Sequence, residues 1–197
     1  MKLVVLASAS PRRKEILGKT GLFFKVDAGR YEENIPSGLR PRSAARFLSA
    51  EKAQVVAGRY ENALVIAADT FIVFRKRILG KPRTAAEAKR MLTLLNGKTH
   101  SVITGFTIFD TKTRRKLSRS VVTKVFFRRL TRGEIAAYVE SGEPLDKAGA
   151  YGIQGFGSAI VRKIEGDYFN VVGFPLSAVV EGLKKFGIDV MKRRKKC

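Results

Sequence analysis

A short apolar run directly before a helix start limits this chain to a few fold classes. Residues 2–7 are rich in Val and Leu, the composition of a buried strand. Ser10 then offers a favoured N-cap and Pro11 a favoured first helical residue, which predicts a helix over residues 11–19. A second apolar run, over residues 63–68, predicts another buried strand. Strands interleaved with helices indicate an α/β fold.

The rest of the chain continues this mixture of patterns. Thr84 and Glu87 form a capping-box pattern before a helix that ends at residue 95. Thr131 and Glu134 repeat the pattern before a helix that ends near Gly142. The other expected elements are helices over residues 43–57 and after Pro175, and strands over residues 70–74, 101–109, 120–127, 159–164 and 168–172, the last two joined by a hairpin turn at 165–167. We therefore expect one α/β domain on a mixed sheet over residues 1–191, and a basic, disordered tail over residues 192–197.

Composition excludes several kinds of site. The single cysteine, Cys197, allows neither a disulfide framework nor a cysteine zinc site, and this suits a reducing compartment. The single histidine, His100, excludes a histidine-rich metal site. The N-terminal apolar run is too short for a signal peptide, and no window approaches the length of a bilayer span. We expect a cytoplasmic protein that works with carboxylates, lysines, arginines and a hard metal ion.

The charge balance is unusual, with 39 Lys and Arg residues against 17 Asp and Glu residues. A net charge of +22 attracts polyanions and allows nonspecific contact with nucleic acid. It is equally compatible with a solvated basic surface or with a highly charged phosphate substrate. The sequence shows no aromatic and glycine pattern of the kind that RNA-binding modules use. Charge alone therefore decides between none of these alternatives.

The first candidate site lies where the first strand meets the first helix. A helix N-terminus offers unpaired N–H groups to an anion, and Ser8 and Ser10 flank it. Arg12 and Arg13 add planar forks that suit phosphate oxygens. The alternative is an ordinary capped helix with both arginines facing water.

Acidic residues supply the second candidate. Asp69 ends an apolar run, where a carboxylate can bind a divalent cation or activate water. The pair Glu32 and Glu33 could hold Mg²⁺. Turn capping by Asp69 and a solvated loop around the glutamates are the alternatives. Lys52 and Lys81 would be ordinary surface lysines, although Gly80 and Pro82 indicate that Lys81 lies on a rigid turn.

The third candidate is the glycine-rich segment over residues 146–155. Its glycines allow close approach of the backbone to a ligand, and Gln154 offers an amide donor and acceptor that suit the edge of a base. The alternative is a flexible loop or bulge.

A series of motifs, taken in order, resembles the Maf family of nucleotide pyrophosphatases over essentially the whole chain. They are Leu6-Ala7-Ser8-Ala9-Ser10-Pro11-Arg12-Arg13, Glu33, Lys52, Ala68-Asp69-Thr70, Leu79-Gly80-Lys81-Pro82 with His100-Ser101-Val102-Ile103-Thr104, residues 146–155, and Gly166-Asp167-Tyr168-Phe169-Asn170-Val171. The resemblance implies an elongated mixed β-sheet with flanking helices and two lobes around a cleft, similar to the inosine triphosphate pyrophosphatases. It also implies a homodimer.

The same resemblance implies hydrolysis of a nucleoside triphosphate to the monophosphate and pyrophosphate with Mg²⁺ or Mn²⁺. Asp69 would activate water or hold the metal, with Glu33 as the second acid, although Glu32 is the alternative. The triphosphate would be held by Arg13, Lys52 and Lys81, with Ser8 and Ser10 lining its site.

The segment Tyr151-Gly152-Ile153-Gln154 resembles the branch of the family that acts on dTTP and UTP, where Arg12, Thr70 and Gln154 would set base preference. Modified pyrimidine triphosphates present the same edge. The alternatives are a methylated or non-standard purine triphosphate as substrate, or a regulatory binding protein of septum formation.

Overall fold

The computed structural model describes residues 2–31 and 34–192. The described chain forms two compact units. The first unit takes in Met1–Asp69, Thr104–Val121 and Gly173–Cys197, and the second takes in Thr70–Ile103 and Val122–Val172. Glu32 and Glu33 lie outside the described residues, as does the tail beyond Lys192.

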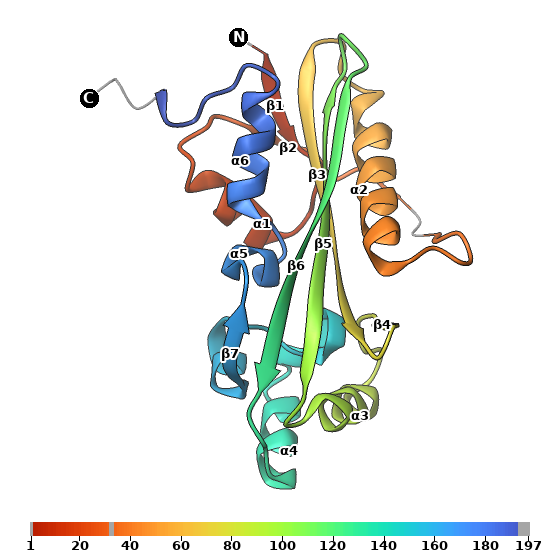
Figure 1. Cartoon of the computed structure of the whole chain (residues 1–197), viewed down its shortest axis with the longest axis vertical. Helices are drawn as coiled ribbons and strands as arrows, with labels where there is room; N and C mark the ends of the chain where they lie inside the picture. The colour runs from red at the N-terminus through yellow and green to blue at the C-terminus, as the bar shows by residue number, and fades with distance from the viewer. Residues whose placement is uncertain (1, 32–33, 193–197) are drawn as a thin grey trace. The chain divides into compact units, whose positions relative to one another are not determined.

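A seven-stranded sheet has the strand order β2-β1-β3-β5-β6-β7, with β4 also paired to β3 (Figure 1). The strand β1 (Leu3–Leu6) lies parallel to both β2 (Lys25–Val26) and β3 (Ala63–Phe74). The pairs β3–β4 (Arg77–Leu79) and β6–β7 (Lys116–Phe127 with Val161–Glu165) are antiparallel. This mixture of pairings confirms the predicted α/β fold on a mixed sheet.

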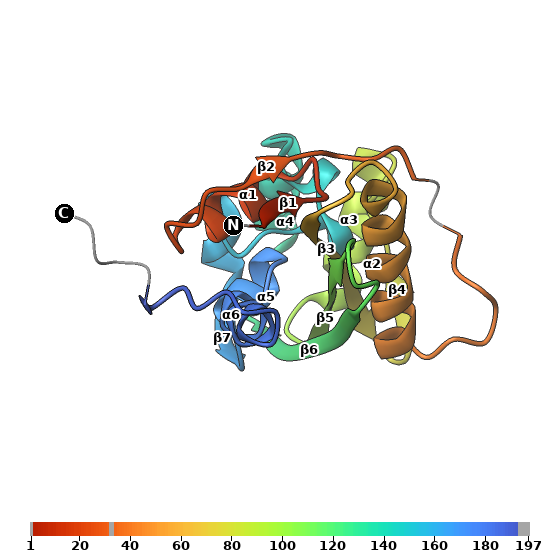
Figure 2. The same cartoon turned by 90° about the horizontal axis from the view of Figure 1, so that it is seen from above.

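Two helices cover opposite faces of the sheet in the first unit (Figures 1 and 2). The helix α2 (Pro41–Ala57) approaches β5 (Thr99–Asp110) so closely that a Cβ on Gly105 would lie 2.1 Å from the Ala45 carbonyl oxygen. On the other face, α6 (Leu176–Lys184) brings Gly182 against Ile108 of β5. Small residues at both contacts let the helix backbones lie against the sheet.

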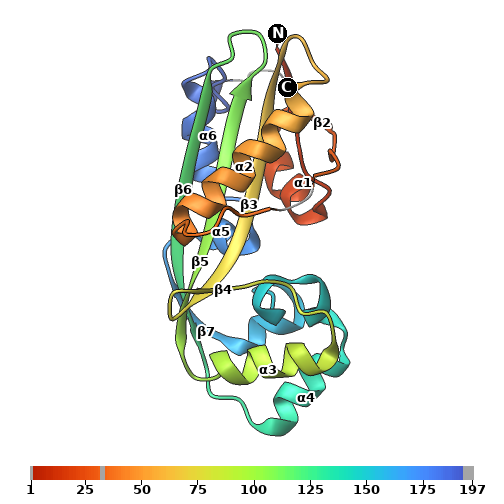
Figure 3. The same ribbon diagram turned by 90° about the vertical axis from the view of Figure 1, so that its right-hand side faces the viewer.

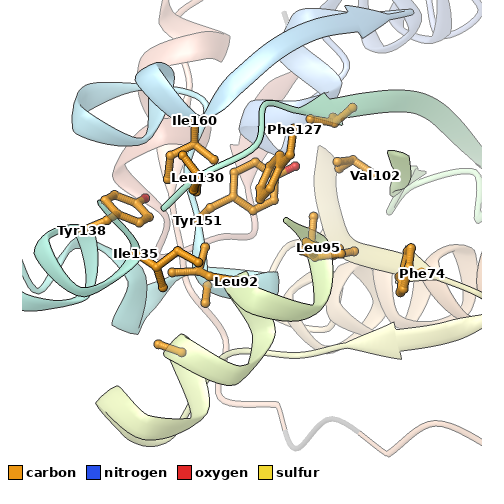
Figure 4. Close-up of a cluster of buried hydrophobic side chains, with 14 residues drawn as sticks. Phe74, Leu92, Leu95, Val102, Phe127, Leu130, Ile135, Tyr138, Tyr151 and Ile160 are labelled. Carbon is orange, nitrogen blue, oxygen red and sulfur yellow. The ribbon is translucent and has the colours of Figure 1, made fainter. Parts of the chain in front are cut away.

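The second unit is built around α3 (Ala85–Leu95) and α4 (Arg132–Glu140) (Figure 3). The helix α3 presents an apolar face to the core, because Ala88, Leu92 and Leu95 are buried. They belong to a cluster that also contains Tyr138 and Tyr151 (Figure 4). Three short 3₁₀ helices complete this unit: η1 (Glu143–Asp146), η2 (Ala148–Ala150) and η3 (Gly155–Ile160).

The expected helix starts are present, with one difference in detail. Ser10 caps α1 (Pro11–Gly18) by accepting from the Arg13 amide, and the Thr131 capping box is complete. The Thr84 hydroxyl accepts a hydrogen bond from the Glu87 amide. The Glu87 carboxylate, however, accepts from the Arg83 amide and not from the Thr84 amide, so the capping box is incomplete.

One predicted strand is wrong. Residues Tyr168–Val172 form the helix α5, not the second strand of a hairpin. The Asp167 carboxylate accepts a hydrogen bond from the Asn170 amide at 3.1 Å, the pattern of a helix N-cap. Asn170 is buried and donates to the Val102 carbonyl and to Thr123 Oγ1. The turn signal at residues 165–167 was therefore a helix start.

Candidate active site

The carboxyl end of β1 places two serines at the start of α1. Ser8 Oγ accepts from the Ser10 amide at 3.2 Å and from Arg13 Nη1 at 3.3 Å. Ser10 Oγ accepts from the Arg13 amide at 3.5 Å. The predicted cluster of Ser8, Ser10 and Arg13 is thus brought together in one place, with Arg12 half-buried beside it. Hydroxyls, helix N–H groups and guanidinium groups form a suitable surface for phosphate oxygens.

A backbone carbonyl far along the chain orients Arg13. The guanidinium Nε–H donates to the Gly173 carbonyl oxygen at 2.9 Å. Gly173 has a φ of +114°, a conformation that favours glycine, and it precedes the buried Phe174. No motif in the sequence pointed to Gly173. The only local signal was a glycine two residues before the proline that opens the last helix.

Asp69 is buried and forms an ion pair with Lys52 of α2. The structure corrects its expected position, because β3 does not end at Asp69 but continues to Phe74. The strand that ends here is β1, whose Leu6 pairs with Ile66. Asp69 lies three residues beyond Ile66 along β3, and Ser8 lies two residues beyond Leu6. The two serines, Arg13, Lys52 and Asp69 therefore all belong to the first unit.

Three further predicted residues, Thr70, Lys81 and Gln154, belong to the second unit. Thr70 follows Asp69 in β3 and is half-buried. Lys81 is exposed on a turn between Gly80, whose carbonyl accepts from the Gly149 amide at 2.9 Å, and the buried Pro82. This backbone hydrogen bond is a physical reason for the expected rigidity of the turn.

Gln154 is half-buried between η2 and η3. The segment that carries it begins at Tyr151, whose hydroxyl lies 2.7 Å from His100 Nε2. The His100, Tyr151 and Phe127 rings meet edge to face. Burial lowers the pKa of His100 to about 4, so the imidazole is neutral near pH 7. Its role here is structural, because it fixes the start of the segment.

Comparison with known proteins shows the family to which the chain belongs. Residues 3–186 match the family described as Maf-like protein. The chain belongs to the Maf-like protein family. The resemblance found in the series of motifs is thereby confirmed.

Curated relatives of this Maf-like protein match along almost its whole length. A protein of Moorella thermoacetica is 49% identical over 193 residues, covering 98% of this chain and 100% of the relative. A protein of Methanosarcina barkeri is 46% identical, covering 98% of each chain. A protein of Bacillus cereus is 49% identical, covering 96% of this chain and 93% of the relative. Each of these three relatives is named dTTP/UTP pyrophosphatase.

Within residues 2–31 and 34–192, no three His, Cys, Asp or Glu side chains gather as a metal-binding group. The helices of the same ranges are too short or too polar to cross a membrane.

Proposed function

We propose that this Maf-like protein hydrolyses dTTP and UTP to the monophosphate and pyrophosphate. The observation that carries the proposal is the sequence identity of 46–49%, over almost the full length of the chain, to three proteins named for this activity. Modified pyrimidine triphosphates belong to the same proposal, since they share the 4-oxo and 3-NH edge. A cytoplasmic location also belongs to it, because nucleoside triphosphates are cytoplasmic substrates.

The triphosphate is proposed to bind at the cluster where β1 ends. Its phosphate oxygens would accept from the hydroxyls of Ser8 and Ser10 and from the Arg13 fork, with Arg12 beside them. The Gly173 contact at Nε and the Ser8 contact at Nη1 hold the guanidinium plane in place before the substrate arrives. Fixing a donor in advance removes part of the entropic cost of binding.

Hydrolysis adds water across the bond between the α- and β-phosphates. Asp69 is proposed to accept the proton from the attacking water, while the anhydride P–O bond breaks and pyrophosphate leaves. Lys52 holds the carboxylate at one place through the ion pair and adds a positive charge beside the phosphates. Cations are needed here because a triphosphate otherwise repels an oxygen nucleophile.

A divalent cation, Mg²⁺ or Mn²⁺, fits the donor set at this site. Mg²⁺ is commonly bound through one or two carboxylates with waters and substrate phosphates, so a cluster of three acids is not required. The buried carboxylate of Asp69 can hold the ion together with the substrate. Glu33, the proposed second ligand, lies outside the described residues, as does its alternative Glu32. When bound, the ion would neutralise charge on the phosphates.

Lys81 and Gln154 are proposed to act on phosphate and base respectively, and the support is chemical. An ammonium group suits phosphate oxygens. The amide of Gln154 can donate to the pyrimidine 4-oxo group and accept from its 3-NH. Arg12 and Thr70 are proposed to take part in base preference together with Gln154, as the family resemblance implies.

Product analysis with a nucleotide panel and Mg²⁺ or Mn²⁺ tests the proposal. Wild type should release pyrophosphate from dTTP and UTP, and Asp69→Asn should lower the rate at least about 100-fold because the proton acceptor is lost. The matched control is Asp110→Asn, which alters another buried carboxylate paired with a lysine, Lys2, away from the site. This control should release pyrophosphate at the wild-type rate per folded molecule. Release of no pyrophosphate from any nucleotide by wild type would refute the proposal.

A further inference from the structure

Gln154 lies on a loop, and a loop recognises a base well only if its backbone is held. We name residues 151–157 the Gln154 loop. Tyr151, at its start, is buried, whereas Phe156, near its end, is exposed. Loops that carry recognition groups are usually positioned by rigid surroundings. The hydrogen bonds around this loop therefore show what fixes Gln154.

The carboxylate of Glu143 binds the far end of the loop. Its Oε2 accepts from the Phe156 amide at 3.0 Å, and its Oε1 accepts from the Gly157 amide at 3.0 Å. The same Oε1 accepts from the Tyr138 hydroxyl at 2.9 Å. A carboxylate bound to backbone N–H groups makes stronger hydrogen bonds than a neutral acceptor would. One side chain thus holds two successive amides of the loop.

The hydroxyl of Tyr138 extends this contact to the near end of the loop. While it donates to Glu143, it accepts from the Gly152 amide at 3.1 Å. Tyr138 is buried in the apolar cluster of the second unit, and burial raises the pKa of its hydroxyl (Figure 4). The group therefore stays protonated and remains a donor to Glu143 at neutral pH.

Glycines let the two ends of the loop close on this pair. A Cβ on Gly157 would lie 2.2 Å from the Gly152 carbonyl oxygen and 2.6 Å from the Tyr138 hydroxyl. Gly155 has a φ of +63°, and a Cβ there would lie 2.9 Å from Glu143 Oε2. No side chain fits at Gly157 without moving the backbone. The density of glycines in this segment thus serves closure of the loop on Glu143 and Tyr138.

We propose that Glu143 and Tyr138 are positioning residues for base selection. They hold the backbone on both sides of Gln154, so that its amide is already placed for the pyrimidine edge. The inference rests on the proposed function and deepens it, because it names residues that act on specificity through Gln154. A misplacement of about 1 Å can cost up to about 100-fold in rate, so small shifts of this loop suffice.

Comparison of dTTP with dCTP isolates this effect. Cytosine presents a 4-amino donor where thymine presents an acceptor, so the two bases differ at the edge that Gln154 would contact. We expect Tyr138→Phe, which keeps the ring and removes the hydroxyl, to lower the dTTP/dCTP ratio of kcat/KM about tenfold. Glu143→Gln should lower it further, because the new amide NH₂ faces backbone N–H donors. The rate on dCTP should stay nearly unchanged in both variants.

Two further variants separate positioning from stability. Glu134→Gln weakens the capping box of α4, the helix that carries Tyr138, but Glu134 has no hydrogen bond to the Gln154 loop in the described structure. It should lower the melting temperature and leave the selectivity ratio at the wild-type value. In a Gln154→Ala background, Glu143→Gln should cause no further loss of selectivity, since the group that it positions is already absent.

Amide hydrogen exchange gives a readout that is independent of activity. The Gly152, Phe156 and Gly157 amides should be protected in wild type and should exchange faster in Glu143→Gln. Faster exchange with an unchanged dTTP/dCTP ratio would overturn the inference, as would unchanged exchange and an unchanged ratio. Failure of the proposed function looks different, because wild type would then release no pyrophosphate while its three amides remained protected.

Discussion

The single histidine makes the stability of this protein depend on pH in a way that can be calculated. His100 is 3% exposed, and burial lowers its pKa from the ordinary value of 6.5 to about 4. Between these values the unfolded chain binds a proton that the folded chain does not. Lowering the pH through this window therefore favours unfolding.

The size of the effect follows from the two pKa values. Each pH unit below 6.5 removes about 1.4 kcal/mol until the folded imidazole also titrates. The loss is about 2 kcal/mol between pH 7.5 and pH 5, and about 3 kcal/mol once the pH falls below 4. Asp110, Glu134 and Glu165 have lowered carboxyl pKa values, so they titrate mainly below pH 5. The window from 7.5 to 5 thus separates the titration of the histidine from that of these three carboxylates.

Urea unfolding of wild type and His100→Gln at pH 7.5 and pH 5 measures this loss. The variant keeps a polar group near Tyr151 but has nothing to titrate, so about 2 kcal/mol of the pH dependence should disappear. Because the chain has one histidine, its NMR titration is assigned without further work and should give a pKa near 4. Equal pH dependence in the two proteins, or a titration near 6.5, would refute the reasoning.

Two further predictions concern packing in the first unit. Lys52→Met removes the ammonium group that pairs with the buried Asp69 carboxylate, and should lower the free energy of unfolding in urea by about 3 kcal/mol. Adding Asp69→Asn should recover part of that loss. A double variant no more stable than Lys52→Met would contradict this. Gly105→Ala should place a Cβ against the Ala45 carbonyl and lower the melting temperature by roughly 2–12 °C. Gly133→Ala should not lower it, because a Cβ at this helical glycine would meet only Thr131 Oγ1, at 3.9 Å.

Local chemistry explains which elements could be predicted from the sequence. Ser10 before Pro11 and Thr131 before Glu134 satisfy backbone N–H groups within three residues of themselves, so both helix starts were expected correctly. The same kind of signal at Asp167 was assigned to a hairpin turn. A glycine beside an acid fits a turn and a helix start equally well, and the buried contacts of Asn170 favour the helix.

Some contacts of the candidate site could likewise be predicted from the sequence, and others could not. Ser8, Ser10 and Arg13 lie within six residues of each other, and their grouping could be predicted from the sequence. The pairing of Lys52 with Asp69 could not be predicted from spacing, because it requires α2 to pack on β3. Asp69 lies in the middle of β3, beyond the point where the shorter strand β1 ends, and the sequence did not show that β3 continues past it.

The sequence by itself determined the α/β class, the capped helices and the family, because these depend on short-range hydrogen bonds and on motifs written in order along the chain. Tertiary structure alone decided what orients the site. The Gly173 carbonyl that holds Arg13 is 160 residues away from it, and Glu143 reaches amides 13 and 14 residues further along. Such contacts form only when packing brings distant segments within hydrogen-bonding distance. The order of residues along the chain does not show which distant segments will meet.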